Sequence, residues 1–326
     1  MRIVSLLPSA TEICFALGAG DSVVGVTFEC DYPAAARTRR IVSTTTLPEG
    51  LTPGEIDAVV RARVAAGEDL YKLDAGALQD LNPDVIITQD LCAACALDTT
   101  DVSSALDYLG CTAKVVTTNP HTLPEVLTSI EQIAKAINRN PTPLLTNLTH
   151  RLTATTGTAG TPTTPATAGR SRPQPPERAC DPNRRPERRG PGAHALGRMT
   201  GKRVALLEWT DPPYAPGHWL PEQVELAGGV NILGTAGARS HPVEWSALAG
   251  AEVVIVAPCG FGVDAAYELA EGLVHDDLLP IDSEVWAVDS NSYFARPGPR
   301  LIEGIELLTQ ILTAQTPDPT QARRIR

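Results

Sequence analysis

The sequence predicts an α/β protein with two lobes that are separated by a helical segment. Short apolar strands alternate with amphipathic helices over most of the chain, which is the pattern of parallel sheets covered by helices. The length of 326 residues corresponds to about two domains at roughly 150 residues each. The alternation is interrupted once. This divides the chain into an N-terminal lobe at 1–121, a bridging helical segment at 122–152, an insert at 153–202 and a C-terminal lobe at 203–326.

The N-terminal lobe begins with a short apolar strand at 2–7. Ser9 and Glu12 have the spacing of a capping box, so we expect Ser9 to be the N-cap of a helix that ends at Gly18. Strands that are apolar throughout are typical of a parallel sheet buried on both faces. The rest of this lobe is predicted to contain strands at 23–26, 85–87 and 114–116, and helices at 53–66, 74–81 and 101–109.

The helical segment and the C-terminal lobe follow from the same patterns. Apolar residues recur at helical spacing over 122–138, which predicts an amphipathic helix. Pro141 and Pro143 end this helix, and a second helical pattern begins at Leu144. The C-terminal lobe is predicted to contain strands at 203–207, 253–256 and 285–288, and helices at 220–227, 263–272 and 299–312.

Composition and charge exclude several classes of protein. Hydrophobic residues make up 43% and charged residues 20%, which are ordinary globular values, and no apolar run reaches the roughly 18 residues of a membrane helix. The net formal charge of −11 argues against a nucleic-acid partner, although residues 170–203 hold ten Arg or Lys and only three Asp or Glu. The insert lacks large apolar side chains, so we interpret it as a disordered, solvated linker rather than an RNA or membrane contact.

The N-terminus has no secretory signal pattern. A signal needs an apolar region of about 7–15 residues, whereas the apolar run here is stopped by Pro8. The chain as written therefore has no export address, and we expect it to be cytoplasmic. Its seven cysteines are then expected to be thiols or metal ligands rather than a disulfide framework.

Polar and aromatic side chains follow the predicted strands, which is where ligands bind in open parallel sheets. Glu29 and Gln89 follow strands of the first lobe, and the run from Trp209 to Tyr214 follows the first strand of the second lobe. A two-lobed cleft with aromatic strand ends suits a large planar ligand. Three of the four tryptophans lie in loops or near strand ends, at Trp209, Trp219 and Trp245; for Trp209 and Trp245, a core position is an equal alternative.

Enzyme motifs are absent from the sequence. There is no G-x-S-x-G elbow, no Walker A loop and no H-E-x-x-H motif. The glycines at 18 and 20 follow a helix, so they form no dinucleotide fingerprint. Ser9 has no evident base, which favours a capping role over a nucleophile. We therefore predict a binding protein and not an enzyme.

Four cysteines follow strands and are candidate metal ligands. Cys92 and Cys95 form a single C-x-x-C pair, and Cys30 and Cys259 could meet them from the two lobes. The pair could also be a redox couple at a helix N-terminus or two buried thiols. His218 is a further candidate ligand, although an exposed loop histidine is the simpler interpretation. A shared thiolate metal site and ordinary packed cysteines both stay open, and packed cysteines are favoured.

The chain resembles a known family in both lobes. The opening of the class III solute-binding proteins, which serve iron-siderophore and cobalamin ABC importers, is similar to SLLPSATE at 5–12, GVT at 25–27 and DYP at 31–33. The same family has a strand similar to NPDVII at 82–87. Its vitamin B12-binding branch is similar to DPPY at 211–214, to GGVNI at 228–232 and to the arginines of the closing helix, Arg296 and Arg300.

This resemblance implies two Rossmann-like lobes bridged by one long helix, with the ligand clamped between them. By similarity, Trp245 matches a tryptophan of the cobalamin-binding cleft, Glu29 replaces a cleft tyrosine, and Gln89 replaces another aromatic residue. The implied ligand is a corrinoid and the implied partner is the permease of an ABC importer. We expect a monomer. Members of the family are usually extracytoplasmic, unlike the expectation from the N-terminus.

Two alternatives remain open for the function. One is a siderophore or haem binder on the same scaffold. The other is a cytosolic thiol or metal-binding protein that uses the four strand-end cysteines. No resident cofactor is indicated apart from a metal at these cysteines under the second alternative, and cobalamin would be a ligand. The candidate ligand-binding residues are Glu29, Gln89, Trp209, Tyr214, Trp219 and Trp245.

Overall fold

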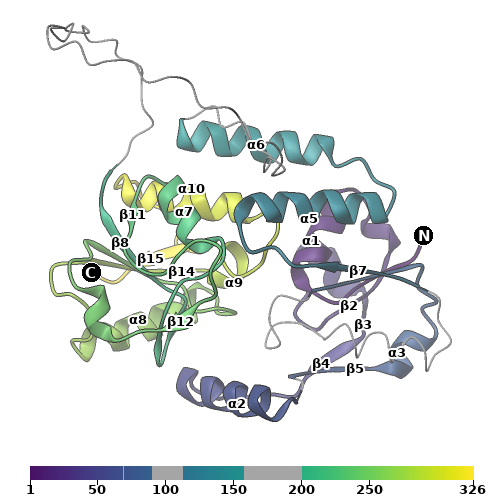
Figure 1. The fold of residues 1–326 in the computed structure, drawn as a ribbon, viewed down its shortest axis with the longest axis horizontal. Coiled ribbons are helices and arrows are strands. Elements are labelled where there is room, and N and C mark those ends of the chain that lie inside the picture. The colour runs from purple at the N-terminus through teal and green to yellow at the C-terminus, as the bar shows by residue number, and fades with distance from the viewer. Residues whose placement is uncertain (69, 90–112, 158–199) are drawn as a thin grey trace, which may run out of the picture.

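Two five-stranded sheets form the centres of two α/β lobes (Figure 1). The computed structural model describes residues 1–68, 70–89, 113–157 and 200–326. The first sheet is parallel, in the order β3-β2-β1-β6-β7, with strands at Arg40–Ile41, Val23–Val26, Ile3–Ser5, Val85–Gln89 and Lys114–Thr118.

The apolar strands of the first sheet are buried on both faces. Ile3 and Ile87 join a large hydrophobic cluster that also contains residues of the second lobe, whereas Val4 and Ile86 join a smaller cluster on the opposite face. Successive side chains of a strand point to opposite faces. This burial on both sides explains why the strands are apolar throughout.

The first helix, α1 (Pro8–Ala16), differs from the prediction at its start. Leu7 is the N-cap and has no side-chain cap, and Ser9 lies buried inside the first turn. The predicted Ser9 capping box is therefore wrong. The physical reason is that Pro8 occupies the first turn, where a residue without an N–H is favoured. The Glu12 side chain turns instead toward the second lobe, as described below.

A two-stranded sheet and two further helices complete the described part of the first lobe. The predicted helix at 53–66 is confirmed as α2 (Pro53–Ala66), and α3 (Ala75–Gln79) lies within the predicted 74–81. Strands β4 (Ser43–Thr45) and β5 (Tyr71–Leu73), which flank α2 in the chain, form a two-stranded antiparallel sheet that the sequence analysis did not predict. The predicted helix at 101–109 lies outside the described residues.

Helices α5 (Leu123–Ala136) and α6 (Thr142–Thr156) connect the lobes along one side of the molecule (Figure 1). Both helical patterns are confirmed, and α6 continues for one turn beyond residue 152, into the segment expected to be insert. Arg151 anchors α6 to α10, since its guanidinium donates to Glu306 at 2.9 and 2.6 Å. The remainder of the predicted insert, 158–199, lies outside the described residues.

The second sheet has the order β11-β8-β13-β14-β15. Its parallel strands are Val230–Asn231, Arg203–Leu207, Val253–Val256 and Glu284–Val288, and the antiparallel edge strand is Ala322–Arg324. A small sheet, β12-β10-β9, packs beside it, with strands at His241–Pro242, Pro213–Ala215 and Trp209–Thr210. The helices are α7 (Leu220–Leu226), α8 (Val263–His275), α9 (Ser290–Tyr293) and α10 (Leu301–Leu312).

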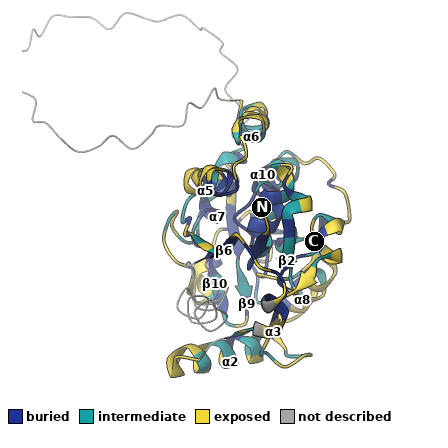
Figure 2. Ribbon diagram, turned by 90° about the vertical axis from the view of Figure 1, so that its right-hand side faces the viewer, coloured by how far each residue is buried: buried dark blue, intermediate teal, exposed yellow. Residues whose placement is uncertain are grey.

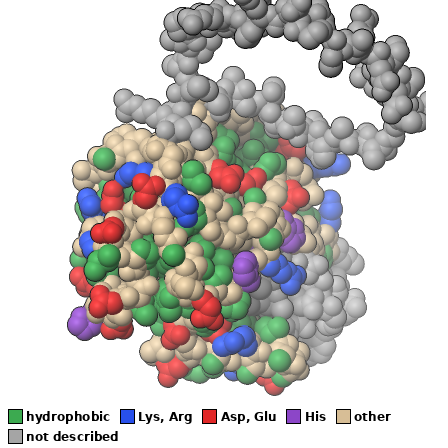
Figure 3. Space-filling view, turned by 60° about the vertical axis from the view of Figure 1, so that its left-hand side comes forward, with side chains coloured by type: hydrophobic (Ala, Val, Ile, Leu, Met, Phe, Trp, Pro, Cys, Tyr) green, Lys and Arg blue, Asp and Glu red, His purple; other side chains and the backbone are tan. Residues whose placement is uncertain are grey.

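The core of the molecule is continuous between the lobes. One hydrophobic cluster contains Ile3 and Ile130 of the first lobe side together with Val204 and Ile305 of the second. Figure 2 shows the buried residues in the interior and the exposed ones on the outer helices, including α2. The face in Figure 3 shows acidic and basic side chains interspersed with apolar ones. Among the helices of the described residues, none is both long and apolar enough to cross a membrane.

Candidate ligand site between the lobes

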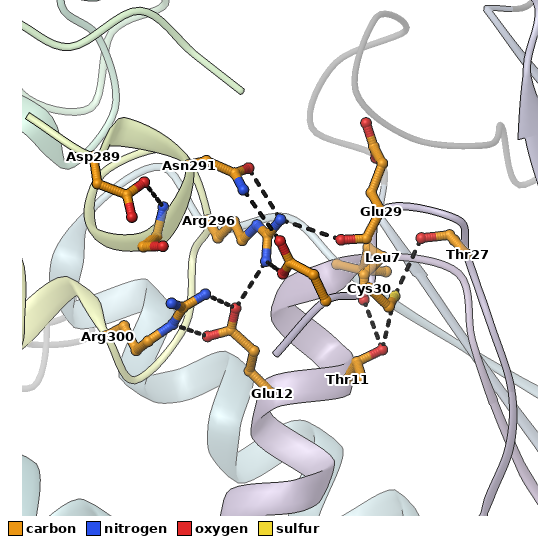
Figure 4. Close-up of polar contacts among 12 residues, drawn as sticks. Leu7, Thr11, Glu12, Thr27, Glu29, Cys30, Asp289, Asn291, Arg296 and Arg300 are labelled. Atoms are coloured by element: carbon orange, nitrogen blue, oxygen red, sulfur yellow. Dashed lines mark hydrogen bonds and ion pairs between the residues drawn. The ribbon is translucent and has the colours of Figure 1, made fainter. Parts of the chain in front are cut away.

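Glu12 of α1 is at the centre of a group of charged side chains where the lobes meet (Figure 4). Arg300 donates two hydrogen bonds to its carboxylate, from Nε at 2.9 Å and from Nη2 at 2.5 Å. Arg296 donates a third from Nη1 at 3.3 Å. The Glu12, Arg296 and Arg300 side chains are only 2%, 8% and 9% exposed. Buried charges with this pairing tie α1 firmly to the segment that precedes α10.

Arg296 extends this group along the first lobe. Its Nη1 donates to Asp31 at 2.5 Å, and its Nη2 donates to Asn291 at 3.0 Å and to the Glu29 carbonyl at 3.2 Å. Burial by itself raises the pKa of Asp31, but the hydrogen bond and positive charge of Arg296 outweigh it and lower that pKa. We call Glu12, Asp31, Asn291, Arg296 and Arg300 the interlobe network.

Each lobe carries an aromatic pair next to the interlobe network. In the first lobe, the rings of Phe28 and Tyr71 lie 6.1 Å apart. In the second lobe, Trp209 and Phe261 meet edge to face at 5.6 Å. The Phe261 carbonyl accepts a hydrogen bond from the backbone of Asn291 at 3.0 Å, which places this pair directly against the network.

Two aromatic residues of the first lobe are well exposed. Phe28 is 38% exposed and Tyr32 is 47% exposed. The guanidinium of Arg300 lies 4.1 Å from the centre of the Tyr32 ring, which orients this ring against the network. Exposed aromatic rings beside a buried polar group provide surfaces on which a planar ligand can stack.

Glu29 lies between the network and the first aromatic pair. Its carboxylate accepts a hydrogen bond from the Tyr71 hydroxyl at 3.4 Å. Burial raises the pKa of Glu29, although Arg296 and the Tyr71 hydroxyl act in the opposite direction. A half-buried carboxyl of raised pKa can donate as well as accept a hydrogen bond at moderately acidic pH.

Two of the predicted ligand-binding residues contact α2 of the opposite lobe. The Trp209 indole donates from Nε1 to the Pro53 carbonyl at 3.2 Å, and the Tyr214 hydroxyl donates to Asp57 at 3.0 Å. Burial, followed by the hydrogen bond to Asp57, raises the pKa of Tyr214. The sequence pattern gave no indication that α2 reaches the second lobe.

The other three predicted ligand-binding residues occupy different positions. Gln89 is buried at the end of β6, opposite Thr118 of β7. Trp219 is buried in the large hydrophobic cluster, and its Nε1 donates to the Phe294 carbonyl at 2.7 Å. Trp245 is half-buried and packs on the hydrophobic cluster beneath α8. Because its ring and its N–H are already used in the core, we leave Trp219 out of the proposal below.

The candidate metal ligands are not brought together in the described part of the chain. Cys30 is buried, and its Sγ lies 3.1 Å from the hydroxyls of both Thr11 and Thr27. Burial raises the pKa of Cys30, which disfavours the thiolate that a metal needs. Cys259 is exposed, Cys92 and Cys95 lie outside the described residues, and the described residues contain no group of three or more His, Cys, Asp or Glu suited to a metal ion.

His218 is half-buried at the lobe junction rather than exposed. Its ring lies 5.5 Å from that of His121, which precedes α5. Burial, the neighbouring His121 and Arg239 all lower the pKa of His218. The ring is therefore neutral at a pH where a solvated histidine is already partly charged.

A separate pocket of about 570 Å³ lies in the second lobe, and Tyr267, Trp286 and Arg324 are among its lining residues. None of the predicted ligand-binding residues lines it. Arg323, at its edge, is paired with Asp264 at 3.1 Å. We therefore place the candidate site at the interlobe network and not in this pocket.

The sequence analysis missed the network as a functional feature. Glu12 and Arg300 are 288 residues apart in the chain, so no local pattern connects them. The signal in the sequence was Glu12, a charged residue followed by apolar residues in the same helix. In a helix buried on most sides, such a carboxylate requires a partner.

Comparison with known proteins supports the fold. No family model matches the chain, and no curated protein matches its sequence. Among solved structures, a periplasmic haem-binding protein of Pseudomonas aeruginosa has a TM-score of 0.59 at 15% identity, covering 99% of this chain and 97% of that one. The periplasmic vitamin B12-binding protein of Vibrio cholerae has a TM-score of 0.50 at 19% identity, covering 96% of each chain.

A third neighbour is an ABC-type Fe³⁺-hydroxamate transport protein of Saccharomonospora viridis. Its TM-score is 0.56 at 17% identity, covering 96% of this chain and 92% of that one. The chain thus has the two-lobed α/β fold of periplasmic substrate-binding proteins, and the predicted fold class is confirmed. These neighbours bind different ligands, so the fold alone does not distinguish the vitamin B12 branch.

Proposed function

We propose that the protein is a solute-binding protein that holds a corrinoid, cobalamin, between its two lobes and delivers it to the permease of an ABC importer. Its role is binding and not catalysis, as for the transport proteins that share its fold. The proposed site comprises the interlobe network, the two aromatic pairs and Tyr32. Trp245 remains part of the proposal through its motif match.

The charge at the strand ends is the observation that favours a corrinoid. Within the segments 5–12, 27–33, 89–112, 208–219, 257–262 and 289–300, which follow six of the strands, the cationic side chains are Arg296 and Arg300. Two further arginines lie close by: Arg37 is 3.9 Å from Asp31, and the charge of Arg239 acts on His218. Arg296 and Arg300 are both paired with carboxylates of the interlobe network. The same segments contain many carboxylates, including Glu12, Glu29, Asp31, Asp90, Glu208, Asp211 and Asp289.

This charge distribution disfavours an anionic ligand. The two propionates of haem would have to displace Glu12 or Asp31 from the arginines, and this would leave buried carboxylates without partners. The periphery of a corrinoid consists mainly of neutral amides. Such amides donate to carboxylates and carbonyls without breaking an ion pair.

The positions of the aromatic pairs also favour a large ring. The aromatic pairs lie on both lobes, so a planar ligand between them would be contacted from two sides. Each stacked aromatic contact contributes about 0.5–1.5 kcal/mol beyond the apolar area that it buries. Two such contacts and the amide hydrogen bonds would account for much of a micromolar affinity, which corresponds to about 8.2 kcal/mol.

Calorimetric titration of the full chain tests the proposal. Cyanocobalamin should bind with 1:1 stoichiometry, and haemin and a ferric hydroxamate siderophore should bind at least about 100-fold more weakly, or about 2.7 kcal/mol. If haemin or the siderophore binds more tightly than cyanocobalamin, that compound and not a corrinoid is the ligand. Absence of binding to all three would contradict the proposal as a whole.

The Phe28→Ala variant tests the site itself. Loss of this exposed ring should weaken cyanocobalamin binding about tenfold without changing the melting temperature, because the ring contributes little to the core. The matched control is Ile281→Ala, which removes a side chain that is 76% exposed, in the second lobe. If the two variants bind cyanocobalamin with equal affinity, Phe28 does not contact the ligand.

A further inference from the structure

Helix α2 contributes no fully buried apolar side chain to a hydrophobic core. Among its fourteen residues only Asp57 is buried, and no apolar side chain of the helix is. Its start is fixed by a capping box between Thr52 and Glu55, and its end by Gly67 in the left-handed conformation. Isolated helices of this length are marginal in water. Contacts with other elements must therefore keep α2 in place.

The first turns of α2 make those contacts with the second lobe. The Pro53 carbonyl accepts from Trp209 and the Asp57 carboxylate accepts from Tyr214. Between them, Gly54 packs so closely that an added Cβ would lie 3.0 Å from Cγ of Asp211. We call this contact, formed by Pro53, Gly54 and Asp57, the α2 latch.

The α2 latch completes a closed circuit of contacts around the interlobe site. On the first lobe, the circuit runs from the network through Glu29 to Tyr71 of β5, and α2 lies in the chain between β5 and its paired strand β4. On the second lobe it runs from the network through Phe261 to Trp209, which contacts α2. In Figure 1, α2 lies on the side of the molecule opposite α5 and α6. The latch is thus the part of the circuit farthest from the connecting helices.

We infer that the α2 latch is the gate of the interlobe site, so that ligand enters and leaves only after the first turns of α2 release the second lobe. This inference rests on the proposed function for its ligand, but not for the release itself. The latch consists of two hydrogen bonds and one close approach, and none of the apolar side chains of α2 is fully buried. It can open while the ion pairs of the network and the shared core remain intact.

Hydrogen exchange measures the release without any ligand. Once off the second lobe, α2 loses its support and unfolds locally, so the exchange of its amides reports the open fraction. The Asp57→Ala variant removes the acceptor of the Tyr214 bond and improves helix propensity. Its α2 amides should exchange about tenfold faster than those of wild type, equivalent to about 1.4 kcal/mol.

Arg61→Ala is the matched control. Arg61 forms an ion pair with Asp57 one turn away but does not touch the second lobe through any contact described above. The control therefore removes the same ion pair and keeps the Tyr214 bond. If Arg61→Ala accelerates exchange as much as Asp57→Ala does, the bond to the second lobe is not what holds α2, and the inference is wrong.

Association kinetics with cyanocobalamin test the gate. If release precedes entry, Asp57→Ala should raise the association and dissociation rates by the same factor, about tenfold, and leave the dissociation constant unchanged. A change in the dissociation rate alone would mean that Asp57 contacts the ligand, and unchanged rates would mean that α2 does not limit entry. Either result would overturn the inference. Absence of binding in the wild type would refute the proposed function and leave the exchange result to decide whether the latch exists.

Discussion

Neutralising Glu12 tests how strongly the interlobe network holds the lobes together. The Glu12→Gln substitution keeps the size of the side chain and removes its charge. Arg296 would keep its bond to Asp31, whereas Arg300 would lose the charge of the side chain that accepts both of its hydrogen bonds. Removing one partner of a buried ion pair costs about 3–5 kcal/mol, because the other charge stays buried without compensation.

Urea denaturation of the full chain measures this cost. With a slope of about 1–3 kcal/mol per molar urea, the midpoint should fall by at least about 1 M. The control is Asp264→Asn, which removes the charge from a pair with Arg323 in which Asp264 is 88% exposed. This control should change stability by less than about 1 kcal/mol. If Glu12→Gln is no more destabilising than the control, the reasoning is refuted.

A double variant covers the case in which Glu12→Gln does not fold. Adding Arg300→Met removes the cation that lost its main partner and keeps an apolar stem of similar length. Since the penalty arises from an uncompensated buried charge, the double variant should be more stable than Glu12→Gln alone. A double variant less stable than either single variant would show that packing, and not charge, holds this contact.

Three further predictions concern other parts of the chain. Replacing residues 158–199 with a short Gly/Ser linker should change the melting temperature by less than about 2 °C, because this composition lacks core-forming side chains; a much larger fall would show a structural role. In the unfolded chain, His218 binds a proton below a pH of about 6.5. In the folded protein, burial lowers the pKa of His218, so the folded state binds this proton less readily and the free energy of unfolding should fall as the pH drops below that value. In the His218→Gln variant, the urea midpoint should depend less on pH in this range. An unchanged dependence would mean that other groups cause it. Among the three cysteines of the described residues, mass spectrometry after brief alkylation should find Cys259 modified before Cys14, because burial raises the pKa of Cys14 to about 12; early modification of Cys14 would contradict its burial.

The sheets could be predicted because their strands are buried on both faces. Val253–Val256 is apolar throughout and becomes a central strand, as its pattern indicates. The edge strand Ala322–Arg324 was missed because it carries two arginines and pairs antiparallel on one side only. The two-stranded sheet of β4 and β5 was missed for a related reason. All but one of its residues are exposed or half-exposed, so tertiary pairing and not an apolar run determines it.

The candidate site was predicted less completely than the fold. Strand-end position drew attention to Glu29 and Trp209, which lie beside the network and beside α2. Position alone could not separate Trp219, whose ring is buried in the core, from residues at the lobe junction. It also could not pair Glu12 with the arginines near the other end of the chain, because that pairing exists only once both lobes have folded.

The two ends of the interlobe site are held by interactions of different strength, and this determines where the site can open. At the network end, three buried charged side chains and a continuous hydrophobic cluster join the lobes. Breaking that end would cost several kcal/mol for the ion pairs alone. At the α2 end, two hydrogen bonds form the connection. Each contributes about 0.5–1.5 kcal/mol, or up to about 3 kcal/mol when one partner is charged. Since the weaker end opens first, α2 should move while the lobes keep their relative position. Exchange protection should therefore be low in α2 and high in α1 and α10, and the reverse order would invalidate this account of the site.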